Sequence, residues 1–288
     1  MMSAMISFFT IPKPFVDEHT SRSQMNAIGS WKHSFPDAEI LVFGDEPGIA
    51  EATETLGVRH VAFIERNELG TPFLSSAYES AERLATNRIL CYLNADIILT
   101  PSFAQAVHAF DAPTFLLIGR RTNLDVTEPL DFRGNWVAAI LRRAEEEGRL
   151  EAPWGSDFFA FPKGSGFAGM PQFAVGRPNW DNWMIAFARE HEIPVVDLTQ
   201  ACVVVHQNHG YAHVRHARDK KWDGPEGDRN RELAGSGRSY TVLDSNYRLT
   251  PTGPQRVTAL RRTLLQGWHS ALQRMPEMVQ ARLTRLKL

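Results

Sequence analysis

Residues 88–100 read Arg-Ile-Leu-Cys-Tyr-Leu-Asn-Ala-Asp-Ile-Ile-Leu-Thr, and this stretch decides the fold class. Ile89 to Leu93 is an apolar, β-favouring run, long enough for one buried strand and too short for a typical helix. The run ends in Asn94-Ala95-Asp96, after which apolar residues resume. A carboxylate at the end of a central strand lies where open α/β sheets bind their ligands. Asp96 is therefore either a ligand of a divalent metal or a polar residue in the turn after a core strand.

The composition is that of an ordinary soluble globular protein. The chain has 288 residues, of which 43% are hydrophobic and 22% charged, so it can bury a full core. A net charge of −2 gives no global reason to expect a nucleic-acid partner. The two cysteines, Cys91 and Cys202, both lie in apolar runs. This placement indicates buried reduced thiols rather than disulfides or a metal site.

Targeting and membrane-spanning segments are not expected. No apolar run approaches the ~20 residues that a bilayer span requires. The first ten residues contain no basic leader and are followed by Pro12-Lys13-Pro14, unlike a signal peptide. We therefore expect a cytoplasmic protein.

Strands and helices alternate with short connections in the first hundred residues. Apolar runs predict strands at 5–11, 39–44, 58–64 and 89–93, and helical spacing predicts helices at 20–35, up to 56, and at 71–86. This alternation is the signature of βαβ units and a parallel sheet, so we expect an α/β fold with a mostly parallel sheet flanked by helices. A Gly-x-Gly-x-x-Gly fingerprint and a P-loop are both missing after the first strand, which argues against a dehydrogenase or a P-loop nucleotide hydrolase.

The second half has a less regular pattern. We expect strands at 114–119, 154–161 and 194–205, a helix at 132–147, and another helix opened by residues 176–183. The polar stretch 220–240 contains several glycines and predicts a loop. The last predicted strand ends in a run of histidines, His206, His209 and His213.

With these segments placed, the chain resembles nucleotide-sugar glycosyltransferases of the glycosyltransferase A fold, closest to the family-two type, over roughly residues 5–215. Four features in the same order carry the resemblance: the strand ending in Asn94-Ala95-Asp96, similar to the family's Asp-x-Asp motif; Gly155-Ser156-Asp157-Phe158-Phe159; Trp180-Asp181 at the start of a helix; and His206 at the end of a late strand. The resemblance implies a transferase of the hexosyltransferase type, active in polysaccharide biosynthesis, that moves a sugar from a nucleotide diphosphate to a hydroxyl of a glycan or a lipid-linked glycan.

Two departures from the family pattern bear on the chemistry. Asn94 replaces the first Asp of Asp-x-Asp, which removes one charge, although its amide oxygen can still accept a hydrogen bond from the sugar or the ribose. The resemblance then implies that Mn²⁺ or Mg²⁺ is held by Asp96 and His206, with His209 as second candidate. In addition, Trp180 stands where the family usually has Glu before Asp181, which leaves one candidate carboxylate for the base.

Asp181 lies in the first turn of its predicted helix and has two interpretations. It is the general base of an inverting transfer, or it only complements the helix dipole, an effect worth ~0.3–1 kcal/mol. Arg177 and Trp180 lie nearby in the sequence and favour the first interpretation, because aromatic faces and cations commonly contact sugars.

The resemblance also implies the remaining binding residues. Some of these positions have ordinary alternatives, because Asp45 before Pro47 is a common turn residue and Ser75 can be solvated. We expect the donor nucleotide to contact Thr10, Pro12, Asp45, Ser75, Asn94 and Ala95, and the acceptor or sugar to contact Gly155, Ser156, Asp157, Arg177, Trp180 and His209.

Three other functions stay open on the sequence. A metal-dependent phosphodiesterase or hydrolase could use His206, His209 and His213, provided that they form a site with an open water position. A sugar-phosphate nucleotidyltransferase has a related sheet but needs a glycine-rich basic loop, which Thr10 to Pro14 does not supply. A non-catalytic sugar-binding member of the fold would keep the same core.

The C-terminal residues 251–288 form a predicted basic amphipathic helical tail after a catalytic domain at 1–250. Apolar residues recur at helical spacing from Val257 to Met275, and Pro276 should break or kink the helix. Such a helix can lie on the inner face of a membrane, or it can pack on the catalytic domain or on a partner subunit.

Overall fold

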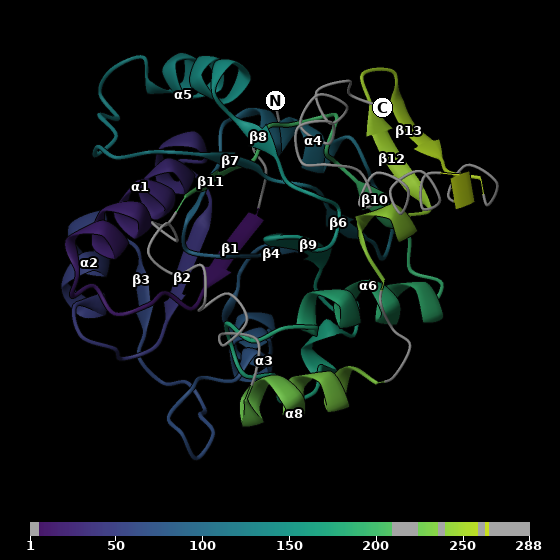
Figure 1. Cartoon of the computed structure of the whole chain (residues 1–288), viewed down its shortest axis with the longest axis horizontal. Coiled ribbons are helices and arrows are strands. Elements are labelled where there is room, and N and C mark those ends of the chain that lie inside the picture. Colours follow the sequence, from purple (N-terminus) through teal and green to yellow (C-terminus); the bar gives the residue numbers. More distant parts are fainter. Residues whose placement is uncertain (1–5, 209–223, 236–239, 259–262, 265–288) are drawn as a thin grey trace.

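A nine-stranded, mostly parallel sheet flanked by helices forms the centre of the molecule, which confirms the expected α/β class (Figure 1). The computed structural model describes residues 6–208, 224–235, 240–258 and 263–264. In spatial order the sheet contains β13 (Gly253–Arg256), β12 (Tyr247–Thr250), β10 (Val195–Asp197), β6 (Leu116–Ile118), β9 (Phe158–Pro162), β4 (Ile89–Leu93), β1 (Ile6–Thr10), β2 (Glu39–Phe43) and β3 (Arg59–Val61).

The reversed strand β9 separates two parallel groups of this sheet, β12-β10-β6 and β4-β1-β2-β3, and the edge strand β13 is antiparallel to β12. β9 runs antiparallel to both of its neighbours, with Cys91 of β4 opposite Ala160 and Leu117 of β6 also opposite Ala160. Because β4 and β6 both oppose β9, they run in the same direction and their carboxyl ends meet at one edge of the sheet. Polar residues that follow these two strands are therefore brought together.

Helices cover both faces of the sheet. The helices are α1 (Glu18–Ser34), α2 (Ile49–Leu56), α3 (Leu74–Leu84), α4 (Ser102–His108), α5 (Trp136–Glu146), α6 (Trp180–Glu190) and α8 (Pro225–Ala234), with the short 3₁₀ turns η1 (Phe167–Gly169) and η3 (Val242–Asp244). Side chains of α3, α6 and α8 share one buried cluster with one face of the sheet, and those of α1, α2 and α4 share another with the opposite face. In Figure 1, α3, α6 and α8 lie together below the strands. The result is a three-layer arrangement.

A second, four-stranded sheet lies beside the first. Its order is β5 (Ile97–Ile98), β11 (Val205–Gln207), β7 (Thr122–Leu124) and β8 (Arg149–Leu150), and α5 packs on it. β5 follows β4 after only three residues, so the chain passes from the first sheet into the second at Asn94-Ala95-Asp96. This crossing point forms the floor of the site described below.

Two predictions about the second half were wrong in detail. The strand expected at 194–205 is two strands in different sheets, because the Asp197 carboxylate accepts the backbone N–H of Thr199 and ends β10 in a turn. Part of the loop expected at 220–240 is the helix α8, which begins with Pro225 and has Glu226 and Asp228 in its first turn.

The predicted tail lies mostly outside the described residues. The boundary expected at 250/251 falls in the turn of the β12–β13 hairpin, so residues 253–256 extend the large sheet as a strand instead of beginning a helix. Within the described ranges, no helix has the length and hydropathy of a membrane span.

Hydrogen bonds from α1 fix the segment that follows Asp96. Trp31 donates its indole N–H to the carbonyl of Ile97 at 2.7 Å, and the Ser30 hydroxyl accepts the backbone N–H of Leu99 at 3.0 Å. All four residues are buried, so these bonds form in a medium where an unmade bond is costly. They hold β5, and with it Asp96, against the large sheet.

We predict that Ser30→Ala lowers the free energy of unfolding by about 1–3 kcal/mol, because the buried N–H of Leu99 loses its acceptor. Urea denaturation measures this change. Thr55→Ala is the matched control, since Thr55 also bonds to a helix carbonyl but is exposed and accepts nothing from another element; its change stays within about 0.5 kcal/mol. Equal stability of Ser30→Ala and wild type would contradict the account.

Candidate active site

A cleft of about 680 Å³ opens at the edge where β1 and β4 end. Because these strands are parallel neighbours, their carboxyl ends lie together, at the place where open α/β sheets bind ligands. The lining comes from residues 11–14 after β1, residues 94–96 after β4, residues 151–157 before β9, residues 175–182 at the start of α6, and further side chains that include Arg121 and His206.

Asp96 and His206 meet in this cleft although 110 positions separate them in the sequence. β5 and β11 are antiparallel, and Ile97 lies directly opposite His206. Asp96 Oδ2 is 3.7 Å from His206 Nε2, and the two side chains are 17% and 9% exposed. The backbone carbonyl of Asp96 also accepts both the backbone N–H and the side-chain amide of Gln207. The carboxylate is therefore held on a fixed main chain beside the imidazole.

This pair fits two neighbouring ligands of one divalent ion. Two ligands bound at ~2.1 Å lie roughly 3–3.5 Å apart, close to the 3.7 Å between Asp96 Oδ2 and His206 Nε2. No group of three or more His, Cys, Asp or Glu side chains in the described part of the chain is arranged to hold a metal. The pair therefore matches the pattern in which one or two protein ligands hold an ion that completes its shell with water and phosphate oxygens.

Asn94 forms two hydrogen bonds with Asp157, the residue before β9. Its side-chain amide donates to Asp157 Oδ1 at 2.6 Å, and its backbone N–H donates to the carbonyl of Asp157. The other oxygen of Asp157, Oδ2, accepts from Arg121 Nη1 at 2.6 Å. Burial acts to lower the pKa of the Arg121 guanidinium, but the adjacent Asp157 carboxylate outweighs it and the pKa is raised. Arg121 is therefore a fixed cation beside the cleft floor.

Asp181 is the half-buried carboxylate in the first turn of α6. Burial raises its pKa from the ordinary value of 3.8 to about 7; the backbone N–H of Asn182 acts in the opposite direction, and the Asp157 charge adds to the rise. Gly155 makes room for it, because a Cβ at Gly155 would lie 2.4 Å from Asp181 Oδ2. The residue before α6, Asn179, has a φ of 74°, which Asn tolerates better than most residues.

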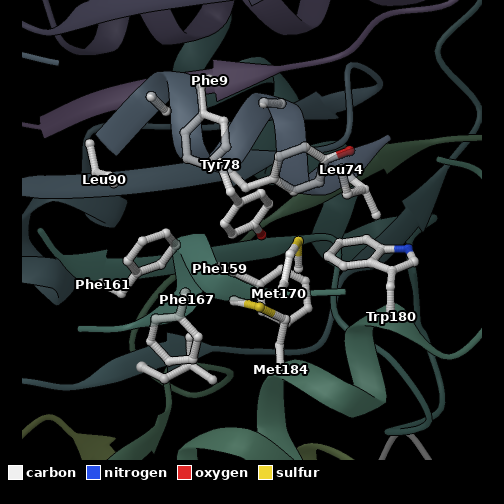
Figure 2. Packing of buried hydrophobic residues seen from close by; sticks show 14 of the residues in the cluster. Phe9, Leu74, Tyr78, Leu90, Phe159, Phe161, Phe167, Met170, Trp180 and Met184 are labelled. Atoms are coloured by element: carbon white, nitrogen blue, oxygen red, sulfur yellow. The ribbon is translucent and has the colours of Figure 1, made fainter. Parts of the chain in front are cut away.

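Trp180 lies mainly in the core. Its ring packs against Tyr92 and Phe159, with ring centroids 5.3 and 5.0 Å away, and the residue is 7% exposed. Figure 2 shows the indole beside other buried side chains, Phe159 and Met170 among them. The residue lines the cleft with only a small part of its surface, and its contact with a sugar stays a prediction. Trp154, which also lines the cleft and is 41% exposed, has the accessible ring.

Arg177 and Ser156 line the cleft, but their side chains form hydrogen bonds within the protein. Arg177 donates through Nε and Nη2 to Glu226 of α8, at 2.9 and 2.5 Å. The Ser156 hydroxyl lies 2.9 Å from the carbonyl oxygens of both Gly119 and Phe158, to either of which it can donate its one proton, and it accepts the backbone N–H of Gly119. These contacts join the end of β6 to the start of β9. Arg177 is thus held at the rim, and the Ser156 side chain has a structural task.

Three residues expected to bind the donor lie outside the cleft lining. Thr10 is fully buried in β1, Ser75 is 4% exposed in α3, and the Asp45 side chain is 68% exposed and paired with Arg66 at 2.5 Å. Glu46, one residue later, lines the cleft instead. Of the other expected residues, Pro12, Asn94, Ala95, Gly155, Asp157 and Asp181 line the cleft, and His209 lies outside the described residues.

Sequence reasoning missed Arg121, Glu151 and Trp154, all in the cleft lining. A signal for Arg121 was present, because it follows a predicted strand whose carboxyl end meets the same sheet edge as β4. The Glu151 carboxylate accepts the Asn123 amide at 2.6 Å. Burial acts to raise its pKa, but this hydrogen bond and others outweigh it, so the pKa is lowered.

Comparison with known proteins returns solved structures only. No family model and no curated protein matches the chain. Similar structures include a mannosyltransferase from Pyrobaculum calidifontis in complex with GDP-Man and Mn²⁺, at 17% identity and a TM-score of 0.41, covering 79% of this chain and 67% of that one. Glucosyl-3-phosphoglycerate synthase from Mycobacterium tuberculosis, in complex with Mg²⁺ and UDP, matches at 16% identity and 0.45, covering 73% and 74%.

A nucleotide-diphospho-sugar transferase structure from Desulfovibrio desulfuricans matches at 10% identity and a TM-score of 0.45, covering 81% of this chain and 97% of that one. These similarities concern the fold alone.

We predict that Asp181→Asn stabilises the protein increasingly as the pH rises from about 4 to 8. Between the ordinary pKa of 3.8 and the raised pKa of about 7, folded Asp181 keeps a proton that the unfolded chain has lost, so stability falls as the pH rises through this window. Asn imitates the protonated acid and removes this loss. Melting temperatures at pH 5 and pH 8 measure the difference, which corresponds to a few kcal/mol at most.

Asp131→Asn is the control for the pH series. Its exposed carboxylate accepts a hydrogen bond from Arg133 and has a lowered pKa. Replacing it therefore does not stabilise the protein more as the pH rises. A melting-temperature difference for Asp181→Asn that is the same at pH 5 and pH 8 would contradict the assigned pKa.

Proposed function

We propose that this protein is a metal-dependent glycosyltransferase that moves a sugar from a nucleotide diphosphate to a hydroxyl acceptor. The observation that carries the proposal is the meeting of Asp96, His206 and Asp181 in one cleft at the carboxyl edge of the sheet. The first two are suited to a divalent ion, and the third is suited to proton transfer. Sugar transfer needs both, because a diphosphate leaves while a hydroxyl loses its proton.

The charge of the cleft supports the need for a metal. Its lining includes five carboxylates, Glu46, Asp96, Glu151, Asp157 and Asp181, but only three lysine or arginine side chains, Lys13, Arg121 and Arg177. The guanidinium of Arg121 is paired with Asp157, and that of Arg177 with Glu226. Apart from Lys13, a diphosphate would therefore meet negative or already neutralised groups, which favours its entry together with a divalent cation.

Asp96 and His206 would hold the ion. A bound Mn²⁺ or Mg²⁺ supplies Lewis-acid stabilisation of the departing diphosphate. The protein's own part is to hold the two ligands on β5 and β11, whose backbones are paired.

Asp181 would take the proton of the acceptor hydroxyl in an inverting transfer. A pKa of about 7 is well placed for this task, because a general base works best when its pKa lies near the working pH. Gly155 keeps the approach to its Oδ2 open. Transfer by Asp181→Asn at the wild-type rate would contradict this role.

Trp154 offers an accessible ring at the cleft, and aromatic rings are common partners of sugars, so a glycan or a lipid-linked glycan suits this side. The membrane contact proposed for the tail at 251–288 rests on its sequence alone.

We predict that one class among UDP-, GDP-, CMP- and dTDP-sugars raises the melting temperature of the wild type, and only with Mn²⁺ or Mg²⁺ present. Ligands that bind the folded state stabilise it by mass action. Asp96→Ala and His206→Gln lose this shift, because each removes one of the two metal ligands. Asp111→Ala, which removes an 87% exposed carboxylate that pairs with Arg88 away from the cleft, keeps it.

An equal shift in EDTA, or an unchanged shift in Asp96→Ala, would contradict metal-dependent binding. Phosphodiester hydrolysis by the wild type without any acceptor would favour the hydrolase instead. Stabilisation by free sugars but by no nucleotide sugar would favour a sugar-binding member of the fold.

A further inference from the structure

Asn94 and Asp157 form a bonded pair across the two central antiparallel strands. Leu93 of β4 lies opposite Phe158 of β9, so Asn94 and Asp157 are the next pair beyond the ladder. They share a backbone hydrogen bond of 3.0 Å and a side-chain hydrogen bond of 2.6 Å. Both residues line the cleft, and the Asp157 side chain is 12% exposed.

The chemistry of Asp157 fixes which end of the Asn94 amide points toward it. An ionised carboxylate only accepts hydrogen bonds, and Arg121 already donates to Oδ2. The atom of Asn94 that meets Oδ1 is therefore the NH₂ nitrogen, as observed. The carbonyl oxygen Oδ1 of Asn94 receives no hydrogen bond from the described residues and is left for a ligand.

We propose that Asp157 is a positioning residue that holds the Asn94 amide with its carbonyl oxygen presented to the cleft, where it accepts a hydroxyl of the nucleotide sugar. This inference rests on the proposed function. It also explains why position 94 carries an amide: the negative charge lies at Asp157, the residue before β9, and Arg121 balances it.

An acid at position 94 conflicts with Asp157. In Asn94→Asp, two carboxylates would face each other where a 2.6 Å hydrogen bond now lies, with no proton donor between them. An amide at position 157 removes the conflict. In the double variant Asn94→Asp/Asp157→Asn, the new amide can accept from Arg121 through its oxygen and donate to the new carboxylate through its nitrogen. The exchange preserves both hydrogen bonds and the net charge of the cleft.

The test is a double-mutant cycle over these two positions. Affinities for UDP-, GDP-, CMP- and dTDP-sugars with Mn²⁺ are measured by calorimetry, and melting temperatures are measured without metal. In Asp157→Asn the amide at position 94 is free to turn over, so we expect affinity for the bound sugar nucleotide to fall about tenfold. In the double variant the oxygen at position 94 is again held toward the cleft, and affinity returns to within about threefold of wild type.

Asp111→Asn controls for the loss of one negative charge outside the cleft. The Asp111 side chain is 87% exposed, pairs with Arg88 and does not line the cleft. We expect the affinity of this variant to stay within about threefold of wild type. Asn94→Asp alone should give the lowest melting temperature of the cycle.

The possible outcomes separate failure of this inference from failure of the proposed function. Wild-type affinity in Asp157→Asn, with a lowered melting temperature, would assign Asp157 a purely structural task and overturn the inference. Loss of affinity in the double variant equal to that in Asp157→Asn would show that the charge at position 157 matters and not the orientation at position 94, which also overturns it. If the wild type binds none of the four nucleotide sugars, the proposed function fails, and the inference fails with it.

Discussion

The main-chain carbonyl of Asp96 is the point on which the site depends. It accepts hydrogen bonds from the backbone and the side-chain amide of Gln207, and the next residue, Ile97, is held by Trp31 of α1. These buried bonds tie the large sheet, the small sheet and the first helix to one short segment. A buried carbonyl without a partner is costly, so the segment has little freedom. Asp96 and His206 are therefore neighbours as a consequence of the backbone, before any ligand is present.

The cleft is lined by few cationic side chains, and most of these are paired within the protein. Arg121 and Arg177 are each paired with a carboxylate, Asp157 and Glu226. Of the other carboxylates, Glu46 pairs with Arg66 and Glu151 accepts a hydrogen bond from Asn123. Asp181 has a raised pKa, and Asp96 lies beside His206. The proposed metal dependence therefore rests on the charge balance of the cleft as well as on ligand geometry.

The sequence predicted the parallel part of the fold well and the cleft only in part. β2 and β4 lie where apolar runs of strand length occur, because a strand buried on both faces must be apolar throughout. Asp96, His206 and Asp181 all lie in the cleft, since each adjoins a strand end or a helix start that the pattern could locate.

The features that sequence reasoning missed depend on long-range contacts. The small sheet is made of strands of two or three residues, too short to leave a periodic pattern. α8 is polar, and Asn230 and Glu226 fix it to the segments before α6, through contacts that span 49 to 56 residues. Trp180 looked like a sugar-binding ring but packs in the core, because neighbouring positions in sequence do not reveal which face is buried. The bond between Asn94 and Asp157 depends on the antiparallel register of β4 and β9, which no local pattern specifies.

The most direct test of the central claim is anomalous X-ray scattering from crystals grown with Mn²⁺ and the nucleoside diphosphate of the donor class that stabilises the protein. The account predicts one manganese peak in the cleft, within bonding distance of Asp96 and His206 and in contact with the diphosphate. Diphosphate bound in the cleft without a manganese peak, or a peak whose ligands include neither Asp96 nor His206, would contradict it.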